Sequence, residues 1–205
     1  MKIYQKYLYL DFDGTYTNYG SIFVDYRCTK GIDSDNIILH GHSMNDGSMF
    51  RGLLSYGDAE YYKWHSKILF ESEKEKSVWV IFAICKINVS DDYSLKYLVG
   101  TFQNESDKLD YVYRMRENSL FDTSIKFNEN DHLLTLSTCS YETPNNRTVV
   151  LARKLRKNEK IAFDKITIEA NNDRIDHSTR HFFDENKKHN IEWYDGAFDS
   201  DSFKH

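Results

Sequence analysis

Short runs of apolar and β-branched residues, separated by turn residues, dominate the hydrophobic pattern of this chain. Runs of this length with alternating or continuous apolar positions are typical of β-strands. The pattern predicts strands over 21–26, 37–39, 67–71, 78–89, 134–139 and 147–155. A mostly β fold follows, with the strands forming the core.

Two stretches have helical features instead. Residues 53–64 mix aromatic and polar side chains, and the pair Gly57-Asp58 divides them into short helical pieces. Residues 104–118 predict a longer helix with Ser106 at its N-cap. Its core-facing residues recur at helical spacing: Leu109, Val112, Tyr113 and Arg116.

Composition indicates a single folded domain. The chain has 205 residues, of which 40% are hydrophobic and 15% aromatic, and it contains one proline, so disorder is not expected. A net charge of −5 gives no reason to expect nucleic acid or an anionic membrane surface as a partner. No apolar run approaches the ~18 residues of a membrane span, so the chain as written is expected to be soluble.

One cysteine is well placed for chemistry. Cys139 ends a β-rich run, the turn residues 144–146 follow, and a second β-branched run begins at Arg147. A hairpin of this kind would set the thiol beside a permanent positive charge, which favours the thiolate and offers donors to an oxyanion. Cys28 and Cys85 lie far away without a C-x-x-C pair, so neither zinc nor a disulfide framework is indicated.

A base for this thiol is present elsewhere in the sequence. The apolar run 37–39 ends in His40-Gly41-His42, which presents an imidazole at a strand end. Alternation places His40 and His42 on the same face, so facing alone does not decide between them.

Together these segments resemble the class B sortases, cysteine transpeptidases of Gram-positive cell surfaces. The matching elements are Gly41-His42, the Thr-Leu-Ser-Thr-Cys run at 135–139, and Arg147 eight positions after the cysteine. An Asp-Gly pair and a Tyr-Gly-Ser-Ile-Phe-Val-Asp-Tyr-Arg run near the front of the chain, at 13–14 and 19–27, match as well.

The resemblance implies a sortase-like closed β-barrel with peripheral helices, covering 1–156. A membrane-anchoring helix, two short helices and a first strand found in the family have no counterpart here. The helix at 104–118 either forms a wall of the substrate groove, as in the family, or covers a sheet edge. Residues 157–205 are a charged extension without a family counterpart. There, His177 and His181 could share a helical face, but a solvated amphipathic segment is favoured over a zinc site.

The implied reaction needs neither metal nor cofactor. Cys139 attacks the carbonyl of a Thr-Gly or Thr-Asn bond in the sorting signal of a surface protein, His42 protonates the leaving amine, and Arg147 stabilises the oxyanion. A cell-wall or pilin amine then takes the acyl group, at the extracellular face of the membrane. His42 is preferred to His40 because it matches the family's Gly-His.

Four further residues are expected near the substrate. Thr138 would shape the oxyanion site through its backbone, and the groove would be lined by Ser43, Tyr141 and Glu142. Arg153, in the same run as Arg147, is expected to be a solvated charge at a strand end. Two alternatives remain: a hydrolase that uses the same groups with water, and a non-catalytic peptide-binding protein.

Overall fold

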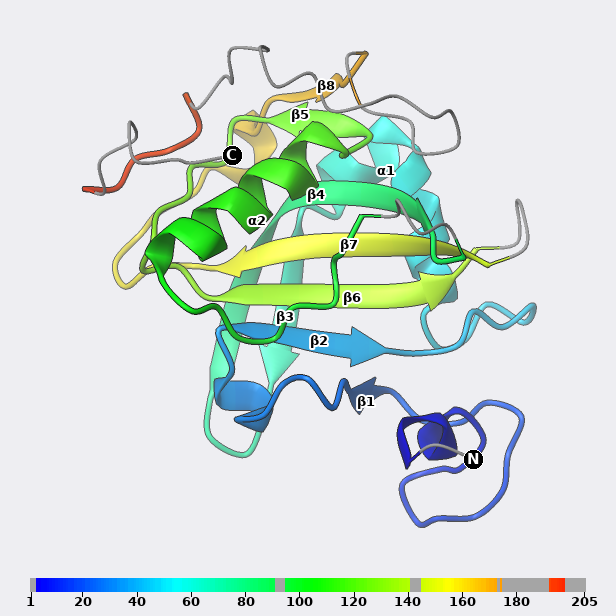
Figure 1. Cartoon of the computed structure of the whole chain (residues 1–205). Coiled ribbons are helices and arrows are strands. Elements are labelled where there is room, and N and C mark those ends of the chain that lie inside the picture. The colour runs from blue at the N-terminus through cyan, green and yellow to red at the C-terminus, as the bar shows by residue number, and fades with distance from the viewer. Residues whose placement is uncertain (1–2, 91–94, 141–144, 173, 175–191, 198–205) are drawn as a thin grey trace.

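Six strands form one curled sheet in the order β1-β2-β6-β7-β4-β3 (Figure 1). The computed structural model describes residues 3–90, 95–140, 145–172, 174 and 192–197. The strands of this sheet are β1 (Phe23–Val24), β2 (Asn36–His40), β3 (Lys67–Glu71), β4 (Lys76–Asn88), β6 (Leu133–Cys139) and β7 (Asn146–Lys154).

The sheet is antiparallel except at one pair. β2 and β6 run parallel, while β6, β7, β4 and β3 pair antiparallel in turn. The mostly β fold is confirmed. The sheet curls as a half-barrel, with β1 and β3 as its two end strands.

The predicted strands match the observed ones closely, with one exception. β3 covers the predicted residues in full, whereas the run predicted over 21–26 gives only the two residues of β1. This strand stops because the chain turns at Asp25, whose carboxylate accepts the backbone N–H of Arg27 while its carbonyl accepts that of Cys28. A side chain that accepts hydrogen bonds from the backbone of its own turn competes with the hydrogen bonds between strands.

The short helical pieces predicted after residue 52 are present as a 3₁₀ helix, η3 (Arg51–Gly57), and α1 (Ala59–Trp64). Asp58 divides them because its carboxylate accepts the backbone N–H groups of Glu60 and Tyr61, as an N-cap does. A further 3₁₀ turn, η2 (Gly31–Asp33), precedes β2.

The longer helix is α2 (Glu105–Glu117), which lies within the predicted residues 104–118. Ser106 as N-cap is wrong: Asn104 is the cap, and its side-chain oxygen accepts the backbone N–H of Asp107. The predicted core-facing residues of α2 are all buried. In Figure 1 the helix lies across the front face of β4 and β7, so it covers a face of the sheet.

Both faces of the sheet are buried. Alternate residues of β6 and β7 separate into two cores, with Leu133, Val149 and Leu151 on the α2 side and Leu134 and Val150 on the opposite side. η3 and α1 cover this second side. A bulge in β4 between Ile81 and Ala83 shifts the register within this otherwise regular ladder.

Residues 3–21 form a small lobe at the edge of the sheet, which we call the N-terminal lobe. It contains the 3₁₀ helix η1 (Ile3–Leu8) and lies beyond the end of β1 in Figure 1. Backbone hydrogen bonds close it, among them Ser21 N–H to Tyr7 O at 2.8 Å and Thr17 N–H to Tyr9 O at 2.9 Å. At Gly20, φ is 60° and a Cβ would lie 2.4 Å from the Leu8 carbonyl oxygen, so only glycine fits.

The extension after residue 156 returns to the domain where it is described. A second small sheet pairs β5 (Phe121–Thr123) with β8 (Ile168–Ala170), preceded by the 3₁₀ turn η4 (Phe163–Lys165). Ile166 and Trp193 are buried in the α2-side core. A wholly solvated extension is therefore wrong for these residues, because their side chains complete the apolar cover of the sheet. His177 and His181 lie outside the described residues.

Arg153 also differs from the prediction. It is 1% exposed, donates to the Lys126 carbonyl at 2.6 Å and forms an ion pair with Glu159 at 2.6 Å. Its position on the strand explains the burial, since residues 149, 151 and 153 share a face.

None of the helices in the described parts of the chain combines the length and apolar character that a membrane crossing requires.

Candidate active site

Cys139 and Arg147 lie directly opposite each other at the loop end of the β6–β7 hairpin. They are paired residues in the antiparallel register, and the backbone N–H of Ser140 donates to the Asn146 carbonyl just beyond them. Arg147 Nη1 donates to Cys139 Sγ at 2.9 Å. Cys139 is half-buried, so its sulfur combines a fixed position with access from outside.

The guanidinium has a second donor to offer. Among the described residues, the two hydrogen bonds of Arg147 both use Nη1, one to Cys139 Sγ and a longer one to its neighbour's carbonyl, Asn146 O, at 3.4 Å. Nη2 is then left as a donor for an oxyanion that forms next to the sulfur. A planar fork with two terminal nitrogens suits this double task.

The β2–β6 ladder brings His42 toward the same strand end. His40 is paired with Ser137 in the parallel register, the Gly41 N–H donates to the Ser137 carbonyl at 3.3 Å, and Thr138 Oγ1 donates to the Gly41 carbonyl at 2.8 Å. Continuing the register by two residues on each chain aligns position 42 with position 139. The sheet thus delivers a histidine and a cysteine to one end.

A backbone carbonyl of the N-terminal lobe holds the His42 ring. His42 Nε2 lies 2.7 Å from the Leu8 carbonyl oxygen. A carbonyl only accepts, so Nε2 must carry the hydrogen in this arrangement, and in the neutral ring Nδ1 is the basic atom. Proton transfer with the substrate would then use Nδ1.

His40, the alternative to His42, and His65 have other partners. His40 Nε2 lies 2.8 Å from Asp25 Oδ2, in a contact that ties β2 to the turn after β1. Burial opposes ionisation of Asp25, yet hydrogen bonds from His40 and Arg27 outweigh it and keep the pKa of this carboxyl below its ordinary value. His65 Nδ1 contacts the Tyr61 carbonyl within α1. Both arrangements fit structural roles.

The remaining residues expected near the substrate have different positions. The Thr138 side chain is buried and occupied by the Gly41 carbonyl, which leaves only its backbone for an oxyanion. Ser43 is 1% exposed, so its side chain offers no surface to a groove. Tyr141 and Glu142 lie outside the described residues. Where the structure describes the chain, no three His, Cys, Asp or Glu side chains gather as metal ligands.

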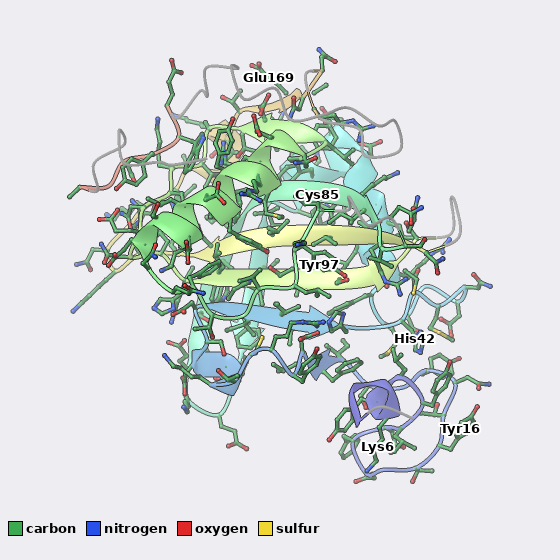
Figure 2. All side chains as sticks on the ribbon, viewed as in Figure 1. Lys6, Tyr16, His42, Cys85, Tyr97 and Glu169 are labelled. Atoms are coloured by element: carbon green, nitrogen blue, oxygen red, sulfur yellow. The ribbon has the colours of Figure 1, made fainter. Side chains whose placement is uncertain are left out.

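Sequence reasoning missed a polar chain beneath the site. Tyr97 Oη lies 2.9 Å from Ser137 Oγ, one strand period before Cys139 on the same face. Tyr111 Oη donates to the Tyr97 carbonyl at 2.9 Å, which anchors this segment to α2. Figure 2 shows Tyr97 in front of β6 and β7. Burial raises the pKa of the Tyr97 phenol, so it stays neutral.

Of these residues, only Ser137 had a signal in the sequence. It lies two positions before Cys139, and alternation along a strand places both on one face. Tyr97 lies in an irregular segment, 95–99, and Leu8 contributes a main-chain atom, so neither residue type nor spacing marks them.

A strand-end thiol that accepts a hydrogen bond from an arginine, and a histidine just past the end of the neighbouring strand, lie on a curled, mostly β fold of the sortase class. The sortase-domain family model matches residues 2–155. This chain therefore belongs to the sortase family.

Its relatives include sortase B proteins. Sortase B of Listeria monocytogenes is 33% identical over 136 residues, which is 66% of this chain and 54% of that protein. Sortase B of Staphylococcus aureus is 29% identical over 157 residues, 76% of this chain and 63% of that protein. The X-ray structure of Clostridium perfringens sortase B has a TM-score of 0.67 at 30% identity, covering 74% of this chain and 81% of that one. The chain thus spans less than two thirds of the length of the first two relatives.

Proposed function

We propose that this protein is a cysteine transpeptidase that cleaves a surface-protein sorting signal and transfers its acyl group to an amine. The 2.9 Å contact between Arg147 Nη1 and Cys139 Sγ carries this proposal. In this contact a cation holds the sulfur in place at the end of a rigid hairpin. The neighbouring strand brings a histidine toward the same end, which supports a cysteine-based mechanism.

In the first half-reaction Cys139 Sγ attacks the scissile carbonyl and forms a tetrahedral intermediate. Arg147 donates to the oxyanion through Nη2, and His42 gives a proton from Nδ1 to the leaving amine as the carbon–nitrogen bond breaks. A thioester with Cys139 remains. The backbone at Thr138 is proposed as a second contributor to the oxyanion site.

In the second half-reaction an amine attacks the thioester. The new carbon–nitrogen bond forms as the carbon–sulfur bond breaks, and the neutral His42 ring takes the proton that the attacking nitrogen loses. The sulfur leaves as a thiolate beside Arg147, which restores the starting arrangement.

Structures of related proteins support the proposed kinds of donor and acceptor. Staphylococcus aureus sortase B has a structure in complex with substrate, and a sortase B structure is complexed with triglycine. By analogy, we place the cut at a Thr-Gly or Thr-Asn bond of a sorting signal and take a cell-wall or pilin amine as acceptor. We propose the cell surface as the place where the protein acts. Tyr141 and Glu142 are proposed to line the substrate groove.

A cleavage assay with and without an added amine tests this function against its alternatives. A fluorogenic peptide with a Thr-Asn bond is incubated with the full chain, alone and with triglycine, and products are identified by mass. A transpeptidase gives a triglycine adduct at the threonine. A hydrolase gives only the free acid in both arms, and a peptide-binding protein leaves the peptide intact.

A further inference from the structure

Exposed large apolar side chains gather on and beside the N-terminal lobe. Of ten such residues in the described parts of the chain, seven lie between positions 7 and 26. They are Tyr7, Tyr9, Phe12, Tyr16, Tyr19, Ile22 and Tyr26. Five of the seven are tyrosines, which offer an aromatic face together with a polar tip.

The same surface is acidic. Residues 7–26 contain no lysine, arginine or histidine and three aspartates, of which Asp11 and Asp13 lie in the lobe and Asp25 is buried, and the loop 43–50 that follows His42 adds Asp46 and no cation. Tyr19 Oη donates to Asp46 Oδ2 at 2.8 Å, which joins the lobe to that loop. The nearest cations along the chain are Lys6, Arg27 and Arg51, and Arg27 is paired with Asp25. An aromatic surface with negative charge complements a cation.

Two of the tyrosines, Tyr9 and Tyr16, follow each other outward from His42. The Tyr9 ring lies 6.0 Å from the His42 ring, and the Tyr16 ring stacks on Tyr9 at 6.3 Å with an angle of 6°. Tyr16 is 69% exposed, so one aromatic face of the stack is open to solvent. Figure 2 shows Tyr16 on the outer side of the lobe, below His42.

We infer that this Tyr9–Tyr16 surface captures the acceptor, a peptide that carries a protonated primary amine, and passes it to His42. The inference rests on the proposed function and names the substrate class of its second half-reaction. An ammonium group over a tyrosine face is attracted by the ring, and the carboxylates around it add to the attraction.

The captured ammonium must become a neutral amine before it reacts. It releases one proton to solvent as it leaves the surface, and the neutral nitrogen then attacks the Cys139 thioester. The second proton passes to His42 while the carbon–sulfur bond breaks. The surface therefore acts on acceptor affinity and not on cleavage of the donor.

The test compares triglycine with N-acetyl-triglycine, which lacks the cationic amine. Binding of each to the full chain is measured by NMR titration, without donor peptide, for the unchanged protein, Tyr16→Leu and the control Trp64→Leu. Trp64 is an exposed aromatic residue, 79% exposed, at the end of α1. In parallel, the concentration of triglycine at which half of the cleaved donor becomes transfer product is measured.

We expect triglycine to bind Tyr16→Leu about two- to fivefold more weakly than the unchanged protein, because one exposed cation–π contact is lost. The half-saturating triglycine concentration rises by the same factor, donor cleavage stays unchanged, and Trp64→Leu behaves as the unchanged protein. Equal binding of the two ligands, or unchanged binding in Tyr16→Leu, overturns the inference. Failure to cleave any donor overturns the proposed function, while the NMR titration still decides the capture of the amine.

Discussion

Arg147 Nη1 donates to Cys139 Sγ at 2.9 Å, across a pair of directly opposed residues in the β6–β7 hairpin. The contact holds the permanent positive charge of the guanidinium beside the sulfur before substrate binds. Because a hairpin end fixes both Cα positions, the side chains need little rearrangement to reach each other.

Replacing Arg147 by lysine tests whether the fork matters. A lysine ammonium has three N–H donors on a single nitrogen, so it lacks the planar fork that offers the sulfur and the oxyanion two separate nitrogens. Single-turnover acylation by Arg147→Lys should fall by about 10²-fold or more, the usual cost of losing one oxyanion donor. Arg114→Lys, at an exposed position of α2, is the control and should be close to neutral. Equal, mild effects of the two changes would leave Arg147 with a structural role.

The hold of Leu8 on His42 can be disturbed from a distance. Gly20→Ala places a methyl group 2.4 Å from the Leu8 carbonyl oxygen and should displace it from His42 Nε2. Turnover should drop, and ¹⁵N NMR of the ring should show loss of the pure Nε2–H tautomer. The control is Gly14→Ala, which has a similarly positive φ of 81° but no atom within 4 Å of the added carbon. An unchanged tautomer in Gly20→Ala contradicts this role for Leu8.

Glu159 should matter for stability because it is the partner of a buried arginine. Glu159→Gln leaves Arg153 buried with Asp131 at 3.9 Å as its remaining acidic contact. We expect a loss of about 2–3 kcal/mol in the free energy of unfolding, below the full cost of a broken buried pair because Glu159 is partly exposed. Urea denaturation measures it. Glu169→Gln, on the exposed face of β8, is the control. An equally small change in the free energy of unfolding for both variants would mean that the buried charge of Arg153 does not need Glu159 as its partner.

Asp25 gives the fold a pH dependence on the acid side. Its pKa is lower in the folded chain than the ordinary value, so its stabilisation is fully present above about pH 4, the unfolded pKa, and is lost as pH falls through the lower folded pKa. Asp25→Asn should therefore cost about 1–3 kcal/mol at pH 7, and the gap to the unchanged protein should narrow below pH 4. Denaturation series at several pH values measure that gap. A gap that is constant with pH would mean that the carboxylate charge is not what stabilises the turn.

How far the sequence predicts this structure depends on the kind of signal. Cys139 and Arg147 could be placed together because a turn at 144–146 lies midway between two β-rich runs, which makes the pairing a local geometric consequence. The short front strand was overpredicted because Asp25 satisfies its own turn, a competition that the apolar pattern does not record.

The errors and omissions at the site have physical reasons as well. The prediction of a solvated Arg153 rests on its charge at a strand end, although its alternation with buried Val149 and Leu151 points inward. The Leu8 carbonyl could not be found, because a main-chain acceptor 34 positions before His42 has no signature in residue type. Tertiary contacts of backbone atoms need the fold itself.

The central claim is that Cys139 carries the acyl group, and intact-mass spectrometry after an acid quench tests it most directly. The full chain is mixed with a peptide containing a Thr-Asn bond, quenched within one turnover, and digested to locate any adduct. We expect a mass increase equal to the amino-terminal part of the peptide on Cys139, its absence in Cys139→Ala, and its retention in Cys28→Ala and Cys85→Ala. Burial raises the pKa of the Cys85 thiol to about 12, so this residue should not compete. An adduct that persists in Cys139→Ala, or cleavage by the unchanged protein with no thioester at any quench time, would contradict the account.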